Sequence, residues 1–401
     1  MPMTDRRRFL TMLTAAACGA TSGIQTSNVL GTSPEPSVPR PCPPTAWKKL
    51  GTVLAGGEQP LQNFTCPAEP LDNGRWRIWY SQSGSRSGFN VGFAEGRPGE
   101  ALSRQLAVLS PGEPVDAPLA IGNLPPEWRP VQVVYLRLRN GHHRIYFWAH
   151  GPGVVRYVAA ESEDGRRYRV LDPSHPCLYH PHDRAVDGKT AAEAGLRQLA
   201  GKAPSRPAGE PPAPARLVSN DATNVYQLDD GTFEMYSVAL VEVGKDDPRY
   251  VAHDNAAGWL RVIDRYVSAD GLKWTDRRRV IERHTQDPTD LQFYYLAVTH
   301  TSQGRIGLLG HYRVEAQTMD LEWCFSADGI TWQRPARRAW LPRGQPDEAD
   351  CHGIYASHAL VCSEGRWHLF YTATNASHNH KQSYGRPTQV VMHAVTDSLW
   401  T

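Results

Sequence analysis

Short runs of alternating apolar and polar residues, separated by glycine turns, recur along most of the chain. In five places an apolar strand leads through a turn containing glycine into an aromatic-rich strand, which is the pattern of a β-hairpin. The many glycines, prolines and aromatic residues favour short strands over long helices. We expect these hairpins at residues 63–82, 131–150, 220–240, 290–312 and 350–374.

A Ser-x-Asp-Gly-x-x-aromatic box follows three of these hairpins. It reads SEDGRRY at residues 162–168, SADGLKW at 268–274 and SADGITW at 326–332. The Asp-Gly step predicts a tight turn between the outer two strands of a unit, and the aromatic residue can cover that turn. We therefore expect the Ser and Asp side chains to make hydrogen bonds within the turn rather than to contact a substrate.

Repetition of one strand unit predicts a repeat architecture. Five units of four short strands indicate an all-β fold, a five-bladed β-propeller with four-stranded antiparallel blades, over residues 47–401. A β-sandwich is the alternative, but it would not explain why the same strand pair recurs. The first two boxes are widely separated because residues 183–216 form an insertion, with a short predicted helix followed by an Ala/Pro-rich loop.

The amino terminus predicts export. Arg6, Arg7 and Arg8 precede Phe9 and Leu10 and a mildly apolar run, which resembles a twin-arginine signal over residues 1–29. The alternative is a chance basic start before a short helix. Residues 30–46 are a Pro-rich linker. Cys18 stands in a faint lipoprotein box, so it is a candidate for a lipid anchor, and we expect a periplasmic, extracellular or membrane-anchored bacterial protein.

Charge and cysteine usage exclude several classes of function. The net charge of +2, from 43 basic and 41 acidic residues, gives no reason to expect a nucleic acid or an anionic membrane as partner. No run of about eighteen apolar residues exists, so no transmembrane helix is expected. The six cysteines after Cys18 form no metal-ligand spacing, and those within strands, such as Cys324 and Cys362, are expected to be buried free thiols. They are Cys42, Cys66, Cys177, Cys324, Cys351 and Cys362.

We expect no metal and no cofactor. The spacing of His180, His182 and Asp183 could ligate a metal ion, but a surface turn is the favoured interpretation of that loop.

Four stretches together carry a family resemblance. They are NDATNVYQLDDGTFEMYSV from residue 220, LQFYYLAVTHTSQGRIGLLGHY from 291, LEWCFSADGITWQR from 321 and DCHGIYASHALVCSEGRWHLFYT from 350. The chain resembles, over roughly residues 47–400, the five-bladed propeller glycoside hydrolase superfamily that includes families 32 and 43, in a family-32-like exported bacterial branch. The invertase signatures W-x-N-D-P-N-G, R-D-P and E-C are absent, so sucrose or fructan hydrolysis is not expected.

A propeller gathers the first strand of each blade around one axis, so residues that lead those strands converge at one mouth. Asp221, Asp290 and Asp350 stand at or near this position, and the resemblance implies that acidic residues placed this way do the chemistry. Three carboxylates in one cleft cannot all ionise cheaply, so one is expected to stay protonated and act as an acid. We assign Asp221 and Asp350 as the leading catalytic pair, with Asp290 tuning their pKa or holding a hydroxyl. The alternative for each is a turn or strand-start cap.

The proton donor is less clearly marked. Glu69, Glu322 and Glu348 are candidate acids, and His378 could replace a carboxylic acid, as could His380 beside it. His352 would share a strand face with Asp350. Aromatic residues near the mouth could stack on sugar rings, although their alternation also fits packing between blades. They are Tyr294, Tyr295 and Tyr355; the candidates for substrate contact are then Glu69, Tyr294, Glu322, His352 and His378.

The leading hypothesis is an exported glycoside hydrolase that cleaves an oligo- or polysaccharide with carboxylates at the axial mouth. The first alternative is a propeller that binds carbohydrate without cutting it. The second is an interaction platform, because propellers serve many functions.

Overall fold

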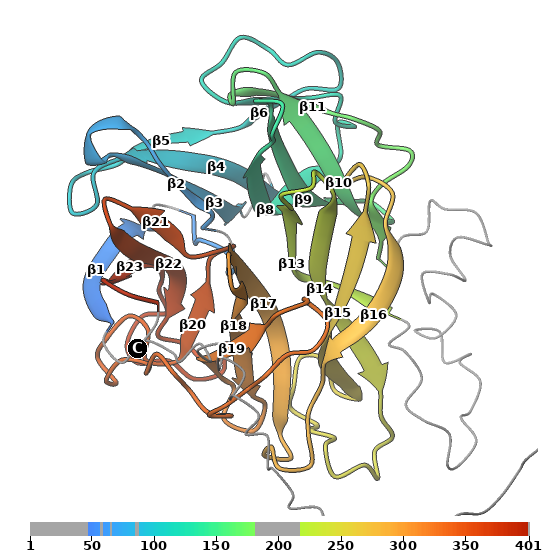
Figure 1. Cartoon of the computed structure of the whole chain (residues 1–401), viewed down its shortest axis with the longest axis vertical. Helices are drawn as coiled ribbons and strands as arrows, with labels where there is room; N and C mark the ends of the chain where they lie inside the picture. The colour runs from blue at the N-terminus through green and yellow to red at the C-terminus, as the bar shows by residue number, and fades with distance from the viewer. Residues whose placement is uncertain (1–46, 57–58, 65, 85–87, 181–216, 400–401) are drawn as a thin grey trace, which may run out of the picture. The chain divides into compact units, whose positions relative to one another are not determined.

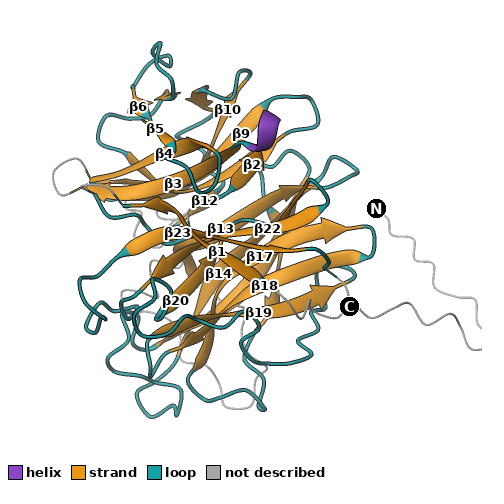
Figure 2. Ribbon diagram, turned by 90° about the vertical axis from the view of Figure 1, so that its left-hand side faces the viewer, coloured by secondary structure: helices purple, strands orange, loops and turns teal. Residues whose placement is uncertain are grey.

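The computed structural model describes residues 47–56, 59–64, 66–84, 88–180 and 217–399. These residues form β-strands, loops and one short 3-10 helix, η1 (Asp72–Gly74) (Figure 2). The predicted all-β class is therefore confirmed. Within this part of the chain, no helix has the length and apolar character that crossing a membrane requires. The predicted signal, linker and insertion, at residues 1–29, 30–46 and 183–216, lie outside the described residues.

Three sheets are formed by consecutive segments of the chain (Figure 1). The first has the strand order β2 (Ala68–Pro70), β3 (Trp76–Gly84), β4 (Gly88–Gly96) and β5 (Ser103–Leu106). The second has the order β6 (Val108–Leu109), β7 (Ala120–Gly122), β11 (Arg167–Val170), β10 (Val154–Ser162), β9 (His143–Gly151) and β8 (Arg129–Arg137), with β12 (Leu178–Tyr179) paired to β10. The third has the order β13 (Leu217–Gln227), β14 (Phe233–Glu242), β15 (Trp259–Ser268) and β16 (Thr275–Ile281).

The fourth sheet joins two groups of strands by a single parallel pair, Met319 with Gly353. One group is β17 (Leu291–Thr301), β18 (Gly304–Arg313) and β19 (Thr318–Ser326). The other is β20 (Gly353–Ala356), β22 (Arg366–Thr374), β23 (Gln389–Thr396) and β1 (Lys48–Ala55), with β21 (Val361–Ser363) paired to β22. In chain order there are thus five strand groups, which we number 1 to 5, and β1 completes group 5 by pairing antiparallel with β23. Each of the five predicted hairpins contains an antiparallel strand pair.

The hydrophobic core is divided among the interfaces between these groups. Each of five clusters unites buried side chains of at least two groups, and large aromatic residues supply much of the buried area. Burying one such side chain is worth roughly 1.5–3 kcal/mol, so each interface is a substantial source of stability. The members include Trp79 with Phe147 for groups 1 and 2, Trp148 with Phe233 for 2 and 3, Tyr236 with Leu296 for 3 and 4, Trp323 with Tyr371 for 4 and 5, and Trp76 with Phe370 for 5 and 1.

The Ser-Asp-Gly box closes its turn as predicted. Ser326 Oγ accepts the backbone N–H of Gly329 at 2.8 Å and donates to Asp328 Oδ1 at 3.0 Å. The same carboxylate oxygen accepts the backbone N–H groups of Ile330 and Thr331, both at 2.8 Å. The other two boxes repeat these bonds around Ser162 with Asp164 and Ser268 with Asp270.

The box also connects neighbouring groups, a role that its sequence did not predict. Tyr146 of group 2 donates its hydroxyl to the carbonyl of Gly271 in group 3, at 3.0 Å. Tyr236 of group 3 donates to the carbonyl of Gly329 in group 4, at 3.3 Å. Each box glycine has a positive φ, 74° at residue 271 and 75° at 329. The glycine therefore serves both the turn and the close approach of the next group.

One cysteine prediction is wrong. Cys324 is a buried free thiol, and burial raises its pKa, as expected for a cysteine inside a sheet. Cys362 is also free but exposed. It lies at the centre of β21, a three-residue strand whose two other side chains are partly buried, so the alternation of the strand points this side chain toward solvent.

Substituting the box glycine tests this packing. A Cβ at residue 329 would lie 2.6 Å from Tyr236 Oη and 2.8 Å from Arg305 Nε, whereas a Cβ at Gly365, which has a φ of 74°, would meet nothing within 4 Å. We expect both Gly→Ala variants to lose about 1–2 kcal/mol because of the left-handed backbone. Gly329→Ala should lose about 1–3 kcal/mol more through overpacking. Chemical denaturation measures both values, and equal losses would contradict the inter-group role of the box.

Candidate functional site

The first strand of three of the predicted hairpins is bulged near its start. The pairing register shifts between Val131 and Val134 in β8, within residues 218–223 of β13, and within residues 293–296 of β17. Bulges turn side chains away from the regular alternation of a strand and are common next to active sites. The bulges in β13 and β17 contain Asp221 and Tyr294, two of the residues that the sequence marked as candidates.

Tyr294, Tyr355 and His378 form a hydrogen-bonded triplet from three separate segments. His378, in the loop after β22, places Nε2 2.8 Å from Tyr294 Oη and Nδ1 2.8 Å from Tyr355 Oη. Burial, and then the positive charge of Arg261, lower the pKa of His378 to about 3. The imidazole is therefore neutral at pH 7, so one ring nitrogen donates to a phenol and the other accepts from the second phenol.

A buried arginine lies against this triplet. The Arg261 guanidinium sits over the ring of Tyr294, 4.6 Å from its centroid, and donates to Asp254 Oδ2 at 2.8 Å and Gln292 Oε1 at 2.7 Å. Burial alone would raise the pKa of Asp254, but Arg261 and the Tyr312 hydroxyl outweigh burial and lower it. Both partners are thus ionised, and the pair satisfies a charge that would otherwise be costly to bury.

Asp221 lies near enough to this arginine and to the two phenols for its charge to act on their pKa values. Its side chain is partly exposed, while its backbone carbonyl accepts the indole N–H of Trp148 at 3.3 Å. Burial raises the pKa of Tyr294 and of Tyr355, and the negative charge of Asp221 adds to the rise at both. The same charge helps to raise the pKa of Arg261. Of the predicted residues, the structure therefore brings Asp221, Tyr294 and His378 into one cluster.

Phe64 gives the cluster an aromatic wall. This residue precedes β2 and has a positive φ of 62°. Its ring stacks on Tyr294 with centroids 5.4 Å apart and meets Tyr355 edge-on at 4.8 Å. The cluster thus combines aromatic surface, one partly exposed carboxylate and a fixed positive charge, and it draws residues from groups 1, 3, 4 and 5.

Asp290 and Asp350 each face a cation of their own. Asp290, directly before β17, accepts from Arg313 at 2.7 and 3.0 Å. Asp350 is buried, 2.6 Å from Lys49 Nζ of β1, and accepts the Tyr371 hydroxyl at 3.0 Å. These contacts provide local charge compensation for each carboxylate and link Asp350 to the closure of group 5. The catalytic roles of Asp290 and Asp350 stay predictions.

The other predicted residues have structural partners. Buried Glu322 accepts from Arg334 at two positions, both 2.8 Å, and pairs with His311. Glu69 accepts from Arg77 at 2.8 Å. The His352 ring lies 5.3 Å from that of Tyr384, Glu348 accepts the backbone N–H of Gln345, and His380 is exposed. Their substrate roles stay predictions, and of the spacing His180, His182 and Asp183 only His180 is described.

The expected protonated acid has no counterpart among the carboxyl groups with a clearly shifted pKa. Each such pKa in the described part of the chain is lowered. Glu234 is an example: burial would raise its pKa, but His300 and Arg305 outweigh burial and lower it to about 2. These carboxyl groups are therefore ionised at neutral pH and cannot donate a proton.

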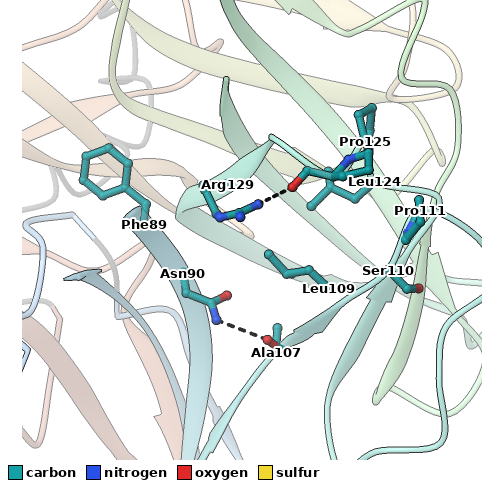
Figure 3. Close-up of a pocket in the computed structure, with 10 residues that line it drawn as sticks. Phe89, Asn90, Ala107, Leu109, Ser110, Pro111, Leu124, Pro125 and Arg129 are labelled. Atoms are coloured by element: carbon teal, nitrogen blue, oxygen red, sulfur yellow. Dashed lines mark hydrogen bonds between the residues drawn. The ribbon is translucent and has the colours of Figure 1, made fainter. Parts of the chain in front are cut away.

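A second candidate position is a cavity of about 350 Å³ between groups 1 and 2 (Figure 3). Phe89, Leu109 and Leu124 contribute apolar surface to it. Asn90 donates to the carbonyl of Ala107 at 3.1 Å, and Arg129 donates to that of Pro126 at 2.7 Å. Among the described residues that line this cavity none is acidic, so it offers a binding surface rather than acid–base chemistry.

Sequence comparison finds no match to this chain, either among protein-family models or among curated proteins. Solved structures are similar in fold. An N-acetylgalactosamine deacetylase from F. plautii, in complex with blood group B trisaccharide, is 13% identical over 88% of this chain and 94% of its own, with a TM-score of 0.52. A GH62 hydrolase in complex with xylotriose is 9% identical over 87% and 97%, with a TM-score of 0.50. A GH43_1 enzyme from Xanthomonas citri is 14% identical over 88% and 90%, with a TM-score of 0.48.

The first two likenesses show the fold alone. The chain has the all-β, propeller-type fold of these two proteins, one a deacetylase and the other a GH62 hydrolase, and this is the fold type that the sequence resemblance implied.

The depressed pKa of His378 predicts a pH dependence of stability. In the unfolded chain, histidine has a pKa near 6.5, whereas His378 in the folded protein has a pKa of about 3. Between these two pH values His378 is protonated in the unfolded chain and neutral in the folded protein, so acid favours unfolding. Stability should therefore fall as the pH is lowered from 7 to 5. His378→Gln should make this fall less steep, which urea denaturation at both pH values measures. The same substitution at exposed His380 is the control, and an unchanged slope in His378→Gln would contradict the prediction.

Proposed function

We propose that this protein is an exported enzyme that hydrolyses a glycosidic bond in an oligo- or polysaccharide at the cluster around Asp221. One observation carries the proposal: a partly exposed carboxylate, Asp221, lies near enough for its charge to act on Arg261 and on the two phenols that share His378. Aromatic faces that bind sugar rings and a carboxylate that faces the anomeric carbon are what this reaction needs.

We infer further that the five strand groups are five blades of one propeller. Three observations support this count. Five core clusters link each group to the next and group 5 to group 1. Within the fourth sheet, which has eight strands, groups 4 and 5 are joined by one residue pair only, between β19 and β20. The pairing of β1 with β23 completes group 5 with a strand from the start of the domain, as expected for a closed ring.

We assign Asp221 the role of base or nucleophile. The negative charge of Asp221 helps to keep the Arg261 guanidinium protonated. Because this interaction is mutual, the positive charge of Arg261 also favours the ionised form of the Asp221 carboxylate. An ionised carboxylate can activate water or attack the anomeric carbon, and it stabilises the positive charge that develops there. His378 is neutral and acts as a positioning residue, because its two nitrogens orient Tyr294 and Tyr355. The phenol that accepts from His378 keeps its own proton for a second hydrogen bond.

Binding without cleavage is the second candidate function. It is favoured by the observation that the described carboxyl groups with a clearly shifted pKa are all shifted downward, away from the acid form. An assay panel should therefore include chromogenic glycosides, polysaccharides and N-acetylated sugars, since one protein of similar fold is a deacetylase. Export through a twin-arginine signal and a lipid on Cys18 belong to the same proposal.

Asp221→Asn tests the catalytic assignment. We expect turnover of the best substrate in the panel to fall about 10²–10⁴-fold, the usual contribution of a positioned acid–base group, while the melting temperature stays near that of the wild type. Steady-state kinetics and thermal denaturation give the two readouts.

Asp350→Asn is the matched comparison. It leaves Lys49 facing an amide in a buried site, so it should cost about 1–3 kcal/mol of stability. A folded Asp221→Asn variant with full turnover would overturn the assignment. Absence of turnover by the wild type on the whole panel, together with measurable binding, would establish the binding function instead.

A further inference from the structure

Asn255 links the triplet of Tyr294, Tyr355 and His378 to the buried arginine beside it. This exposed residue lies in the loop between β14 and β15, and its Nδ2 is 3.2 Å from His378 Nε2. Its Oδ1 accepts a hydrogen bond from Arg261 Nη2. These two contacts together determine which ring nitrogen of His378 carries the proton.

The orientation of the Asn255 amide follows from its contact with Arg261. Every N–H group of a guanidinium is a donor and none can accept, so the amide atom that faces Arg261 is the oxygen. The guanidinium is itself fixed, because it also donates to Asp254 at 2.8 Å and to Gln292 at 2.7 Å. The amide nitrogen of Asn255 therefore faces the triplet.

An amide nitrogen can only donate, so its hydrogen bond to His378 Nε2 requires that this ring nitrogen carry no proton. The neutral imidazole of His378 then holds its one proton on Nδ1. Nδ1–H donates to Tyr355 Oη, and Nε2 accepts the hydroxyl of Tyr294, each over 2.8 Å. A hydrogen bond that links the side chain of Asn255 to Tyr294 fits this arrangement, since the Tyr294 oxygen can accept while its proton is donated.

The two phenols are not equivalent in this network. Tyr294 donates its single proton to His378. Tyr355 accepts from His378 and keeps its own proton for a second hydrogen bond. The negative charge of Asp221 acts on Tyr355, so that proton lies within the field of the candidate catalytic carboxylate.

We propose that Asn255 is a positioning residue that holds His378 as the Nδ1–H tautomer and so makes Tyr355, not Tyr294, the phenol with a proton to donate. The value of this donor for catalysis rests on the function proposed above, whereas the tautomer itself does not. Without the amide of Asn255, either tautomer of His378 would satisfy the two phenols equally, because each hydroxyl can donate or accept.

The test observes the ring nitrogens of His378 by NMR in the full chain labelled with ¹⁵N-histidine, since protonated and unprotonated ring nitrogens have well-separated ¹⁵N frequencies. The signals of His378 are those that His378→Gln removes. We expect the wild type to show a protonated Nδ1 and an unprotonated Nε2. In Asn255→Asp a carboxylate oxygen, which can only accept, faces Nε2, so we expect the proton to move to Nε2.

Asn379→Asp is the matched control. It makes the same change of charge one residue from His378, and a carboxylate there can still accept from Ser377 Oγ and from the backbone N–H of Lys381. We expect it to keep the wild-type tautomer. On a substrate from the assay panel, Asn255→Asp should also lower kcat about tenfold, the effect of one hydrogen bond, and Asn379→Asp should not.

The outcomes separate this inference from the proposed function. A wild type with the proton on Nε2, or the same tautomer in Asn255→Asp as in the wild type, overturns the role of Asn255. A tautomer reversed by Asn379→Asp as well overturns it too, because charge alone would then explain the change. The expected tautomers in a protein without turnover on any glycan support the role of Asn255 and overturn the hydrolase. Full turnover by Asn255→Asp with a reversed tautomer supports Asn255 as the residue that sets the tautomer and overturns the value of the Tyr355 proton for catalysis.

Discussion

The antiparallel pairing of β1 with β23 is the constraint on which the rest of this structure depends. It joins the two ends of the described chain in one sheet, and it sets Lys49 of β1 against buried Asp350. Group 5 then packs on group 1 through a cluster that contains Trp76 and Phe370. Within the described part of the chain, each of the five groups thereby packs on both of its neighbours and buries large aromatic residues at each interface.

The buried charge of Arg261 plays a corresponding part in the candidate site. Asp254 and Gln292 fix the guanidinium, the Tyr294 ring lies beneath it, and Asp221 lies close enough to feel its field. One side chain thereby connects a carboxylate and a pair of phenols. Loss of one partner in such a buried ion-pair network lowers the stability of the protein, because it leaves a buried charge without compensation. Networks of this kind are common around functional sites, where they hold side chains in a fixed orientation.

The sequence predicts the strands well because their signals are local. Glycine turns, alternation and the Ser-Asp-Gly box located all five hairpins, and Asp221, Tyr294 and His378 were identified from their places in the repeat. Phe64, Asp254 and Arg261 were not found, because their roles depend on neighbours that the fold supplies. An arginine within the apolar run of β15 was the available signal, since a charge in a buried strand requires a partner. The pairing of β1 with β23 has no local signal at all.

The pairing of β1 with β23 also determines when group 5 can finish folding during synthesis. The first described strand must wait for the last described strand, because Lys48 pairs with Val395. Local hairpins can form as the chain emerges from the ribosome. The pairing of β1 with β23 instead requires contacts between residues that are far apart in the sequence, and such contacts are slow to form. Until β23 has been synthesised, β1 lacks its described partner strand, and the nascent protein is vulnerable to aggregation through that unpaired strand.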